Sequence, residues 1–224
     1  MTTKAEFLKT VKQSLADLNT STKPELPPVP EVWAVNDVPT EQLRQTFAES
    51  LTSVAGRCVF VDKPDETAVQ VANLLRENGV KRVGVLGTEA AKSVAERVTE
   101  HYSTELFFSS TDEADASGMS KLDAGILTPE YLLADTGSCV ISAPTSNDRR
   151  LIYMPPLCVI VAKATSLREH LPQAWQEFLP RWKTATAGEF VIVTGPSRTA
   201  DIEKILVLGV HGPKQVVVFV ETFS

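Results

Sequence analysis

The chain has 224 residues, 43% of them hydrophobic, which is enough to bury one sizeable core and is an ordinary length for a single α/β domain. Its 28 acidic and 22 basic side chains give a net charge of -6 at pH 7, so nucleic-acid phosphates and anionic membrane surfaces are repelled on average. Because the apolar runs are far shorter than the roughly 20 residues of a membrane span and the N-terminus has no apolar signal-peptide stretch, we expect a soluble, cytoplasmic protein that binds no nucleic acid.

The first predicted element is an amphipathic helix, because residues 3–19 place five apolar side chains at helical spacing on a charged segment. These are Phe7, Leu8, Val11, Leu15 and Leu18. The next segment carries five of the fourteen prolines, which exclude a helix and favour an extended linker. We therefore expect a helical arm at 1–20, a Pro-rich linker at 21–40 and an α/β domain at 41–224. The arm is expected to pack on the core or on another chain, as it would in a homo-oligomer.

Strand and helix patterns then alternate. The predicted strands are RCVFV at 57–61, KRVGVLG at 81–87 and ELFF at 105–108. Between them, DETAVQVANLLRENG has a helical stripe that stops at Gly79, and TEAAKSVAERVTEHY is a second helix with Thr88 as its N-cap. This alternation predicts an α/β fold with a mostly parallel sheet covered by helices.

The second half of the sequence is less regular. Short apolar segments and turns alternate in KLDAGILTPEYLLADTGSCVISAP at 121–144, and RRLIYMPPLCVIVAKAT at 149–165 gives two strand candidates around a Pro-Pro break. A long helix is predicted in LREHLPQAWQEFLPRWK at 167–183. The chain then repeats the parallel crossover, with a strand in EFVIVT, a helix in TADIEKILVLG that ends at Gly209, and a strand in VVVFV that is apolar on both faces.

The cysteines and histidines do not form a metal-binding pattern. Cys58, Cys139 and Cys158 are widely spaced, each lies in or beside an apolar run, and no CxxC pair occurs. We expect buried free thiols in a reducing compartment. The three histidines are equally scattered, so no iron–sulfur cluster and no zinc or other metal is expected in this chain.

A candidate ligand loop lies in TGPSRTAD at 194–201, between the predicted strand and helix. The loop that leaves a parallel strand and enters a helix is the usual ligand position in such sheets, because helix-terminal N–H groups point outward there. Candidate ligand-binding residues are Gly195, Ser197, Arg198, Thr199, His211 and Gly212. Arg198 can bind a carboxylate or phosphate. Helix capping alone would equally explain Ser197 and Thr199, and His211 fits a polar turn.

A second candidate lies in the segment Asp135, Thr136, Gly137 and Ser138. Asp135 is the candidate catalytic residue, as a nucleophile or base. Asp-Thr-Gly-Ser is also a sound turn sequence whose side chains hydrogen-bond their own backbone. Thr128 and Glu130 either face the same cleft or start a helical turn. TSNDRR at 145–150, which includes Asp148, is either a solvated hairpin tip or a second anion contact.

Three segments, LLADTGSCVIS, RRLIYMPPLCVIVAKATSL and VTGPSRTADIEKILVLGVHGP, resemble the LUD-domain family, the group that includes lactate-utilisation protein C. The resemblance covers about residues 41–220. It implies a fold similar to the NagB/RpiA superfamily of sugar-phosphate isomerases and CoA transferases. It also implies a role beside iron–sulfur companion proteins in the oxidation of L-lactate to pyruvate. Family members often have Glu-Thr-Gly-Thr where this chain has Asp135 to Ser138, and related CoA transferases use a Glu-x-Gly arrangement for acyl transfer.

Three functional hypotheses follow. The first is a lactate-utilisation subunit that works in a complex, carries no cofactor itself and binds a small carboxylate or another anionic ligand. The second is a free-standing CoA-transferase-like or folate cyclo-ligase-like enzyme that acts on a small acyl or phosphorylated substrate. The sequence lacks a GxGxxG or GxxxxGK[ST] loop, which argues against nucleotide binding. The third is a non-catalytic interaction module. The sequence does not decide whether this chain is itself an enzyme.

Overall fold

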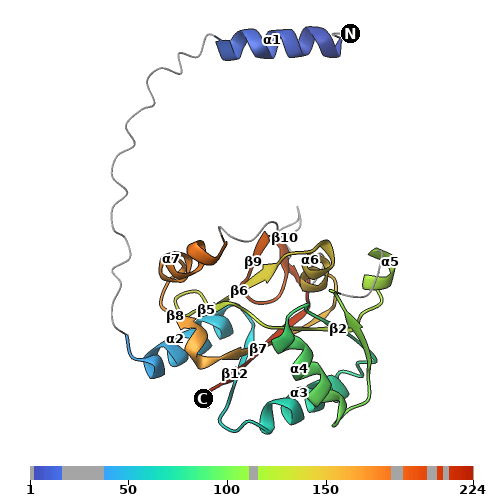
Figure 1. Ribbon diagram of the computed structural model, residues 1–224, viewed down its shortest axis with the longest axis vertical. Coiled ribbons are helices and arrows are strands. Elements are labelled where there is room, and N and C mark those ends of the chain that lie inside the picture. The colour runs from blue at the N-terminus through green and yellow to red at the C-terminus, as the bar shows by residue number, and fades with distance from the viewer. Residues whose placement is uncertain are drawn as a thin grey trace. The chain divides into compact units, whose positions relative to one another are not determined.

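The computed structural model of the chain describes residues 3–16, 38–110, 116–182, 189–200, 206–208 and 212–223. The chain divides into two compact units, Met1–Ala34 and Val35–Ser224. In the first unit, helix α1 (Lys4–Ala16) confirms the helix predicted at the start of the chain (Figure 1). Its side chains Phe7, Leu8 and Val11 are 61%, 46% and 37% exposed. The predicted Pro-rich linker lies outside the described residues except for its last three.

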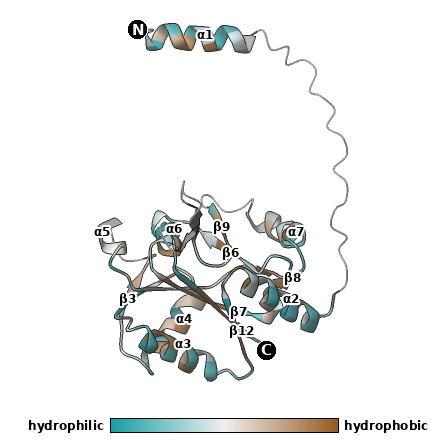
Figure 2. Ribbon diagram, turned by 180° about the vertical axis from the view of Figure 1, so that it is seen from behind, coloured by the Kyte–Doolittle hydropathy of each residue, from teal (hydrophilic) through white to brown (hydrophobic). Residues whose placement is uncertain are grey.

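Six parallel strands form the central sheet of the second unit, in the order β1-β12-β7-β4-β2-β3. Their bounds are β1 Arg57–Val61, β2 Arg82–Val85, β3 Glu105–Phe108, β4 Ala124–Leu127, β7 Leu157–Lys163 and β12 Gln215–Glu221. The predicted α/β fold class with a mostly parallel sheet is therefore confirmed. The middle strands are buried on both faces, and Figure 2 shows their hydrophobic colouring, as expected for a parallel sheet with both faces covered.

Local sequence signals account for the helices on one face of this sheet, where α3 (Glu66–Glu77) and α4 (Glu89–Thr99) lie side by side (Figure 1). Thr88 caps α4 as predicted, because its side chain accepts a hydrogen bond from the Ala91 amide. Gly79 follows the end of α3 with a φ of 61°, a left-handed conformation that glycine adopts without strain. Helix α2 (Thr40–Ser53), which the sequence analysis did not identify, buries Phe47 and Leu51 in the core.

A second sheet of four strands, in the order β8-β5-β6-β9, lies between the central sheet and helix α7 (Leu171–Trp182). The bounds of its strands are β5 Tyr131–Leu133, β6 Ser138–Ala143, β8 Leu167–Arg168 and β9 Glu189–Val193. Side chains of β6 alternate between two cores: Cys139 and Ile141 belong to the main core, whereas Val140 packs with Phe178 of α7. The sheets and helices therefore stack as layers, and α7 covers the outer face of the small sheet.

Two predictions about residues 189–209 are wrong. The strand EFVIVT is present as β9, but β9 pairs antiparallel with β6 and does not continue the parallel crossover. The predicted helix at 199–209 is replaced, where the structure describes it, by β10 (Arg198–Ala200) and β11 (Leu206–Leu208), which pair antiparallel. The Ser197 amide donates to the Pro213 carbonyl at 2.9 Å, so the residues before β10 and after β11 lie side by side, as the two ends of a hairpin do. Periodicity could not separate these cases, because a short apolar run fits either element.

The strand predicted in RRLIY is also wrong, because these residues lie in helix α6 (Ser146–Tyr153). A capping box starts this helix: Thr145 accepts from the Asp148 amide, and the Asp148 carboxylate accepts from the Thr145 amide. Asp148 is only 1% exposed and also accepts a hydrogen bond from Ser109. The predicted solvated hairpin tip is therefore wrong. The alternative, a second anion contact that includes Arg149 and Arg150, stays a prediction. The remaining helical turns are α5 (Ala116–Met119) and η1 (Ala164–Ser166).

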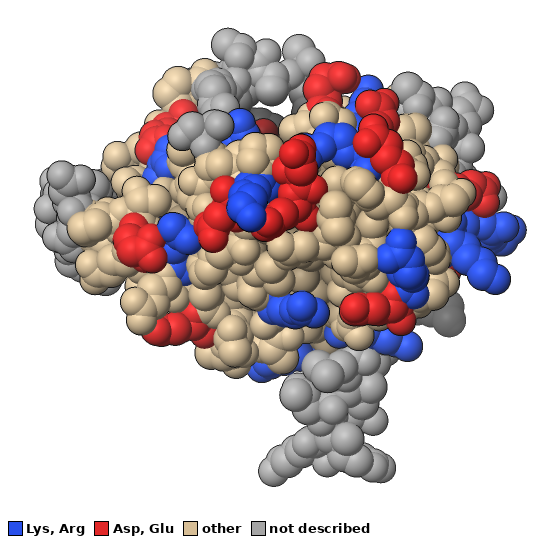
Figure 3. Space-filling view, turned by 90° about the horizontal axis from the view of Figure 1, so that it is seen from below, with Lys and Arg blue, Asp and Glu red and all other residues tan. Residues whose placement is uncertain are grey.

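The surface of the second unit carries charges of both signs. On the face drawn in Figure 3, Lys and Arg side chains lie among Asp and Glu side chains rather than in a block of one sign. Such mixing gives little long-range attraction for a polyanion. Within the described ranges, no helix is both long enough and apolar enough to cross a membrane.

Candidate functional site

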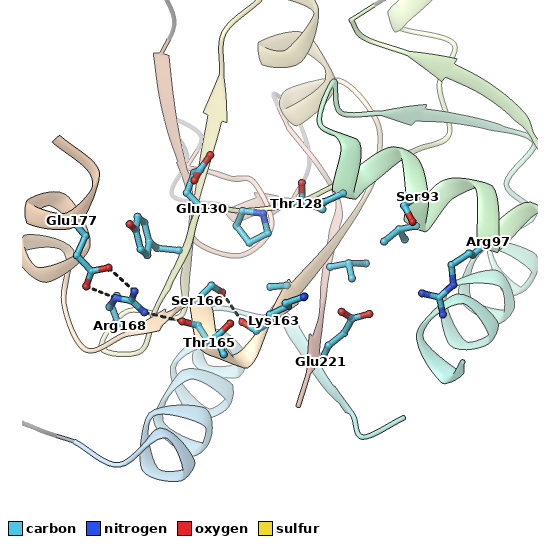
Figure 4. Close-up of a pocket in the computed structure, with 16 residues that line it drawn as sticks. Ser93, Arg97, Thr128, Glu130, Lys163, Thr165, Ser166, Arg168, Glu177 and Glu221 are labelled. Carbon is cyan, nitrogen blue, oxygen red and sulfur yellow. Dashed lines mark hydrogen bonds and ion pairs between the residues drawn. The ribbon is translucent and has the colours of Figure 1, made fainter. Parts of the chain in front are cut away.

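A polar pocket with a volume of about 690 Å³ lies at the carboxyl end of the central sheet (Figure 4). Strands β4, β7 and β12 end at this pocket, and helix α4 and the small sheet supply its walls. Its polar lining residues are Ser93, Arg97, Thr128, Glu130, Tyr131, Lys163, Thr165, Ser166, Arg168, Glu177 and Glu221. The carboxyl ends of parallel strands are the usual place for a ligand in an open α/β sheet, so this pocket is the candidate functional site.

The strand register explains why these residues meet. Lys163 is the last residue of β7 and pairs in parallel register with Glu221, the last residue of β12. Thr128 directly follows the last residue of β4. Residues in register on parallel strands face the same side of a sheet, so Lys163 and Glu221 both face the pocket, as Figure 4 shows.

The cations of the pocket differ in how they are held. Arg168 is bound by Glu177 of α7, with Nη2 and Oε2 2.6 Å apart, and this hydrogen bond is the main cause that raises the pKa of Arg168. The Arg97 guanidinium donates to the Pro64 carbonyl. Lys163 makes no ion pair or side-chain hydrogen bond with any described residue, although its ammonium lies in the pocket. Lys163 is therefore the cation most available to a bound anion.

Hydroxyl groups line the same pocket as Lys163. The Oγ1 atoms of Thr128 and Thr88 lie 2.8 Å apart, so Thr128 is held at the N-terminus of α4. Ser166 donates to the Lys163 carbonyl at 2.7 Å, which fixes the turn after β7. Ser166 uses its one donor in that bond, so Thr128 is the hydroxyl of this pair that can donate to a carboxylate bound at Lys163.

Asp135 does not line this pocket. It lies in the turn between β5 and β6, where its carboxylate contacts Thr136 Oγ1 at 3.1 Å and His170 Nδ1 at 3.2 Å. Gly137 in the same turn has a φ of 64°, and a Cβ atom there would lie 2.2 Å from the Leu51 amide nitrogen of α2. The turn interpretation explains the glycine. The catalytic role of Asp135 stays a prediction.

The structure brings part of the predicted loop at 194–201 together with this turn. Ser138 Oγ and Thr194 Oγ1 lie 2.7 Å apart, and Thr194 lines a smaller pocket of about 220 Å³ together with Gly195, Ser197 and Gly212. This pocket is separate from the one that contains Thr128.

The other residues of the loop at 194–201 are placed differently from expectation. Arg198 is exposed at the start of β10, and the backbone of Thr199 lies in the same strand. Because a strand follows, the helix-capping interpretation of Ser197 and Thr199 is wrong. His211 lies outside the described residues. Ligand binding at these residues stays a prediction.

Sequence reasoning identified Thr128 and considered Glu130, but missed Lys163, Arg97 and Glu221. The available signal was position: Lys163 and Glu221 each terminate an apolar run that was recognised as a strand. A charged residue at the carboxyl end of a buried strand lies where ligands bind in α/β sheets, but the strand order that makes Lys163 and Glu221 neighbours is not visible in the sequence.

The three cysteines are free thiols, as predicted, and come from different strands. Cys139 and Cys158 are buried, and Cys58 is half-buried. Burial raises the pKa of Cys58 and of Cys158 to about 12 and raises that of Cys139 well above its usual range. Within the parts of the chain that the structure describes, no three His, Cys, Asp or Glu side chains gather closely enough to hold a metal ion.

The fold and the pocket define an α/β protein whose candidate site lies at the carboxyl end of a parallel sheet. The sequence profile of the LUD domain matches residues 44–220, so the chain belongs to the LUD-domain family. The crystal structure of a DUF162 family protein from Deinococcus radiodurans is similar to the structure of this chain, with a TM-score of 0.60. That similarity is at 12% sequence identity and covers 82% of this chain and 99% of that chain. It supports the fold alone, and the likeness to the NagB/RpiA superfamily stays a prediction.

Curated relatives are also similar to this chain. YkgG of Escherichia coli strain K12 is 26% identical over 97% of both chains and is described as uncharacterized. A lactate utilization protein C of Oceanobacillus iheyensis is 32% identical over 98 residues, which cover 43% of this chain and 42% of that protein. A protein of the same name from Halalkalibacterium halodurans is 31% identical over 41% of this chain and 40% of that protein. These two alignments with relatives that carry a functional name each span less than half of either chain.

Proposed function

We propose that this chain is a cytoplasmic subunit of an L-lactate-oxidising system, that it acts with iron–sulfur companion proteins, and that its pocket binds the small carboxylate. Membership of the LUD-domain family and the similarity to proteins named lactate utilization protein C support the pathway. The observation that carries the binding site is the Lys163 ammonium, which lies in the pocket without an ion-pair partner among the described residues.

In this proposal, different residues of the pocket supply the positive charge and the hydrogen-bond donors that bind the carboxylate. Lys163 supplies the charge that attracts the carboxylate, and Arg97 offers a second set of donors on the α4 wall. Thr128 and Ser166 supply hydroxyl groups around the same space. The cysteines of this chain are separated and buried, which favours companion proteins as the place for any iron–sulfur cluster.

Calorimetry with L-lactate tests the binding site. Lys163→Met removes the ammonium but keeps an unbranched side chain, and we expect it to weaken L-lactate binding about tenfold or more, the usual effect of losing a charge-assisted hydrogen bond. Lys81→Met is the matched control, because Lys81 is an exposed lysine just before β2, at the amino end of the parallel strands and away from the pocket at their carboxyl end. Equal affinity of wild type and Lys163→Met for L-lactate would remove Lys163 from the site.

Growth on L-lactate tests the pathway. A strain that lacks this chain should fail to grow on L-lactate as sole carbon source and should still grow on pyruvate, because pyruvate enters after the oxidation step. Wild-type chain should restore growth, and Lys163→Met should restore it poorly. Normal growth of the deletion strain on L-lactate would contradict the proposed pathway.

The volume of the pocket favours one alternative, a free-standing CoA-transferase-like or folate cyclo-ligase-like enzyme. A pocket of about 690 Å³ falls within the range of about 300–1,000 Å³ that holds drug-sized ligands, so it has room for a larger acyl substrate than lactate. Calorimetry with acetyl-CoA and acetate distinguishes the two proposals. Tight binding of acetyl-CoA together with no binding of L-lactate would favour this alternative.

A further inference from the structure

Glu221 is a buried carboxylate in the wall of the pocket, and only part of its hydrogen-bonding capacity is used. The residue is 9% exposed. Its Oε1 atom accepts a hydrogen bond from Thr67 Oγ1 at 2.8 Å. Among the described residues, Thr67 is the one side-chain partner of this carboxylate, and Oε2 has none. No described cation lies within ion-pair distance of either oxygen. A buried carboxylate normally accepts several hydrogen bonds, so an acceptor position remains open toward the pocket.

A purely structural role explains half of this arrangement. Thr67 lies in the first turn of α3, where the helix dipole favours a negative charge. The helix and Thr67 together therefore stabilise Glu221 from the side that faces away from the pocket. They do not explain why the carboxylate of Glu221 lines the space that a ligand would fill (Figure 4).

Glu221 and Lys163 are neighbours in register at the ends of β12 and β7, yet they lie too far apart to form an ion pair with each other. The pocket thus presents a cationic donor and an anionic acceptor on adjacent strands, whose backbones are about 4.8 Å apart. A ligand that carries a carboxylate and a hydrogen-bond donor on neighbouring carbon atoms complements both groups at once.

We propose that Glu221 is the residue that makes the pocket select a 2-hydroxy acid over the corresponding 2-oxo acid. The ligand carboxylate binds Lys163, and the ligand hydroxyl donates to Glu221 Oε2. A 2-oxo acid has only acceptor oxygens, so its keto group would leave Glu221 Oε2 unsatisfied and would be repelled by its charge. This inference rests on the proposed function, because it assigns the role of Glu221 within the same carboxylate site.

The test compares L-lactate with pyruvate, measured by calorimetry on the full-length chain. Wild type should bind L-lactate about tenfold or more tightly than pyruvate, which is the effect expected for one hydrogen bond to a charged acceptor. Glu221→Gln keeps an oxygen for Thr67 and turns an amide donor toward the pocket, so it should lower the L-lactate preference to about equality or reverse it. Glu105→Gln is the matched control, because Glu105 is an exposed residue at the opposite edge of the same sheet and its loss should leave the preference unchanged.

A second variant separates recognition from folding. Thr67→Val removes the donor that orients Glu221 while it keeps the shape of the side chain, and it should reduce the preference severalfold without abolishing carboxylate binding. Thermal unfolding of each variant checks that it is folded.

The outcomes distinguish the two proposals. If wild type binds both acids equally, or if folded Glu221→Gln keeps the wild-type preference, the role of Glu221 is overturned and the carboxylate site stands. If wild type binds L-alanine more tightly than L-lactate, the selected donor is an ammonium group and the hydroxyl assignment is wrong. If wild type binds neither L-lactate nor pyruvate, the carboxylate site itself fails, and the role of Glu221 fails with it.

Discussion

At the scale of the single residue, the packing of the turn between β5 and β6 against α2 requires glycine at position 137. This turn contains the candidate catalytic residue Asp135. Gly137→Ala must place a Cβ atom 2.2 Å from the Leu51 amide nitrogen in a left-handed conformation. We expect it to lower the free energy of unfolding by about 3 kcal/mol or more, because strain and a backbone clash add. Gly79→Ala is the control: its φ is also positive, but nothing lies within 4 Å, so only about 1–2 kcal/mol of strain is expected. Equal losses in urea unfolding would contradict the packing argument.

Asp135 belongs to the same turn, and Asp135→Asn tests its predicted catalytic role. The variant removes the charge opposite His170 but keeps an acceptor oxygen for Thr136. We expect a folded protein that is destabilised by about 1 kcal/mol or less, as is usual for partly exposed pairs. Its affinity for L-lactate should equal that of wild type, since Asp135 lies outside the lining of the larger pocket. Loss of growth on L-lactate with a folded variant would instead support catalysis by Asp135.

At the scale of the element, helix α6 is set by its first turn. The sequence T-S-N-D that precedes RRLIY is a capping box, with Thr145 as N-cap and Asp148 at the third helical position. Thr145→Ala should lower the free energy of unfolding by roughly 1–2 kcal/mol. Thr145→Ser keeps a hydroxyl that can cap the helix, so most of the wild-type stability should remain. If both variants had the stability of wild type in urea unfolding, the cap would not determine this helix.

At the scale of the whole molecule, the two compact units should unfold independently. The described hydrophobic core residues all belong to the unit Val35–Ser224, so deletion of residues 1–34 leaves that core complete. We expect the deletion to leave the unfolding midpoint of the remainder within a few degrees and to reduce self-association, because an exposed apolar stripe favours contact with another chain. Analytical ultracentrifugation and thermal melts measure the two effects. A large fall in the midpoint would show that the arm packs on the α/β domain.

Much of the fold follows from patterns within single elements. The stripe and glycine stop of α3, the Thr88 cap of α4 and the two-sided apolar run of β12 each predicted the correct element, because the determining residues lie within one or two turns of each other. The antiparallel pairing of β10 with β11 was missed because a short apolar run fits a helix or a strand, and the run itself does not show which segment it pairs with.

The sequence by itself determined the α/β class, the amphipathic helix at the start of the chain and the free thiols, since hydrophobic periodicity and cysteine spacing are local properties. Only the tertiary structure decided that β9 runs antiparallel in a second sheet and that Lys163 and Glu221 end on adjacent strands. Those two residues are far apart in the chain, with η1, β8, α7 and β9 to β11 between them, and their proximity depends on the order of strands in the sheet. Strand order is fixed by the joint burial of all the elements, which no single segment encodes.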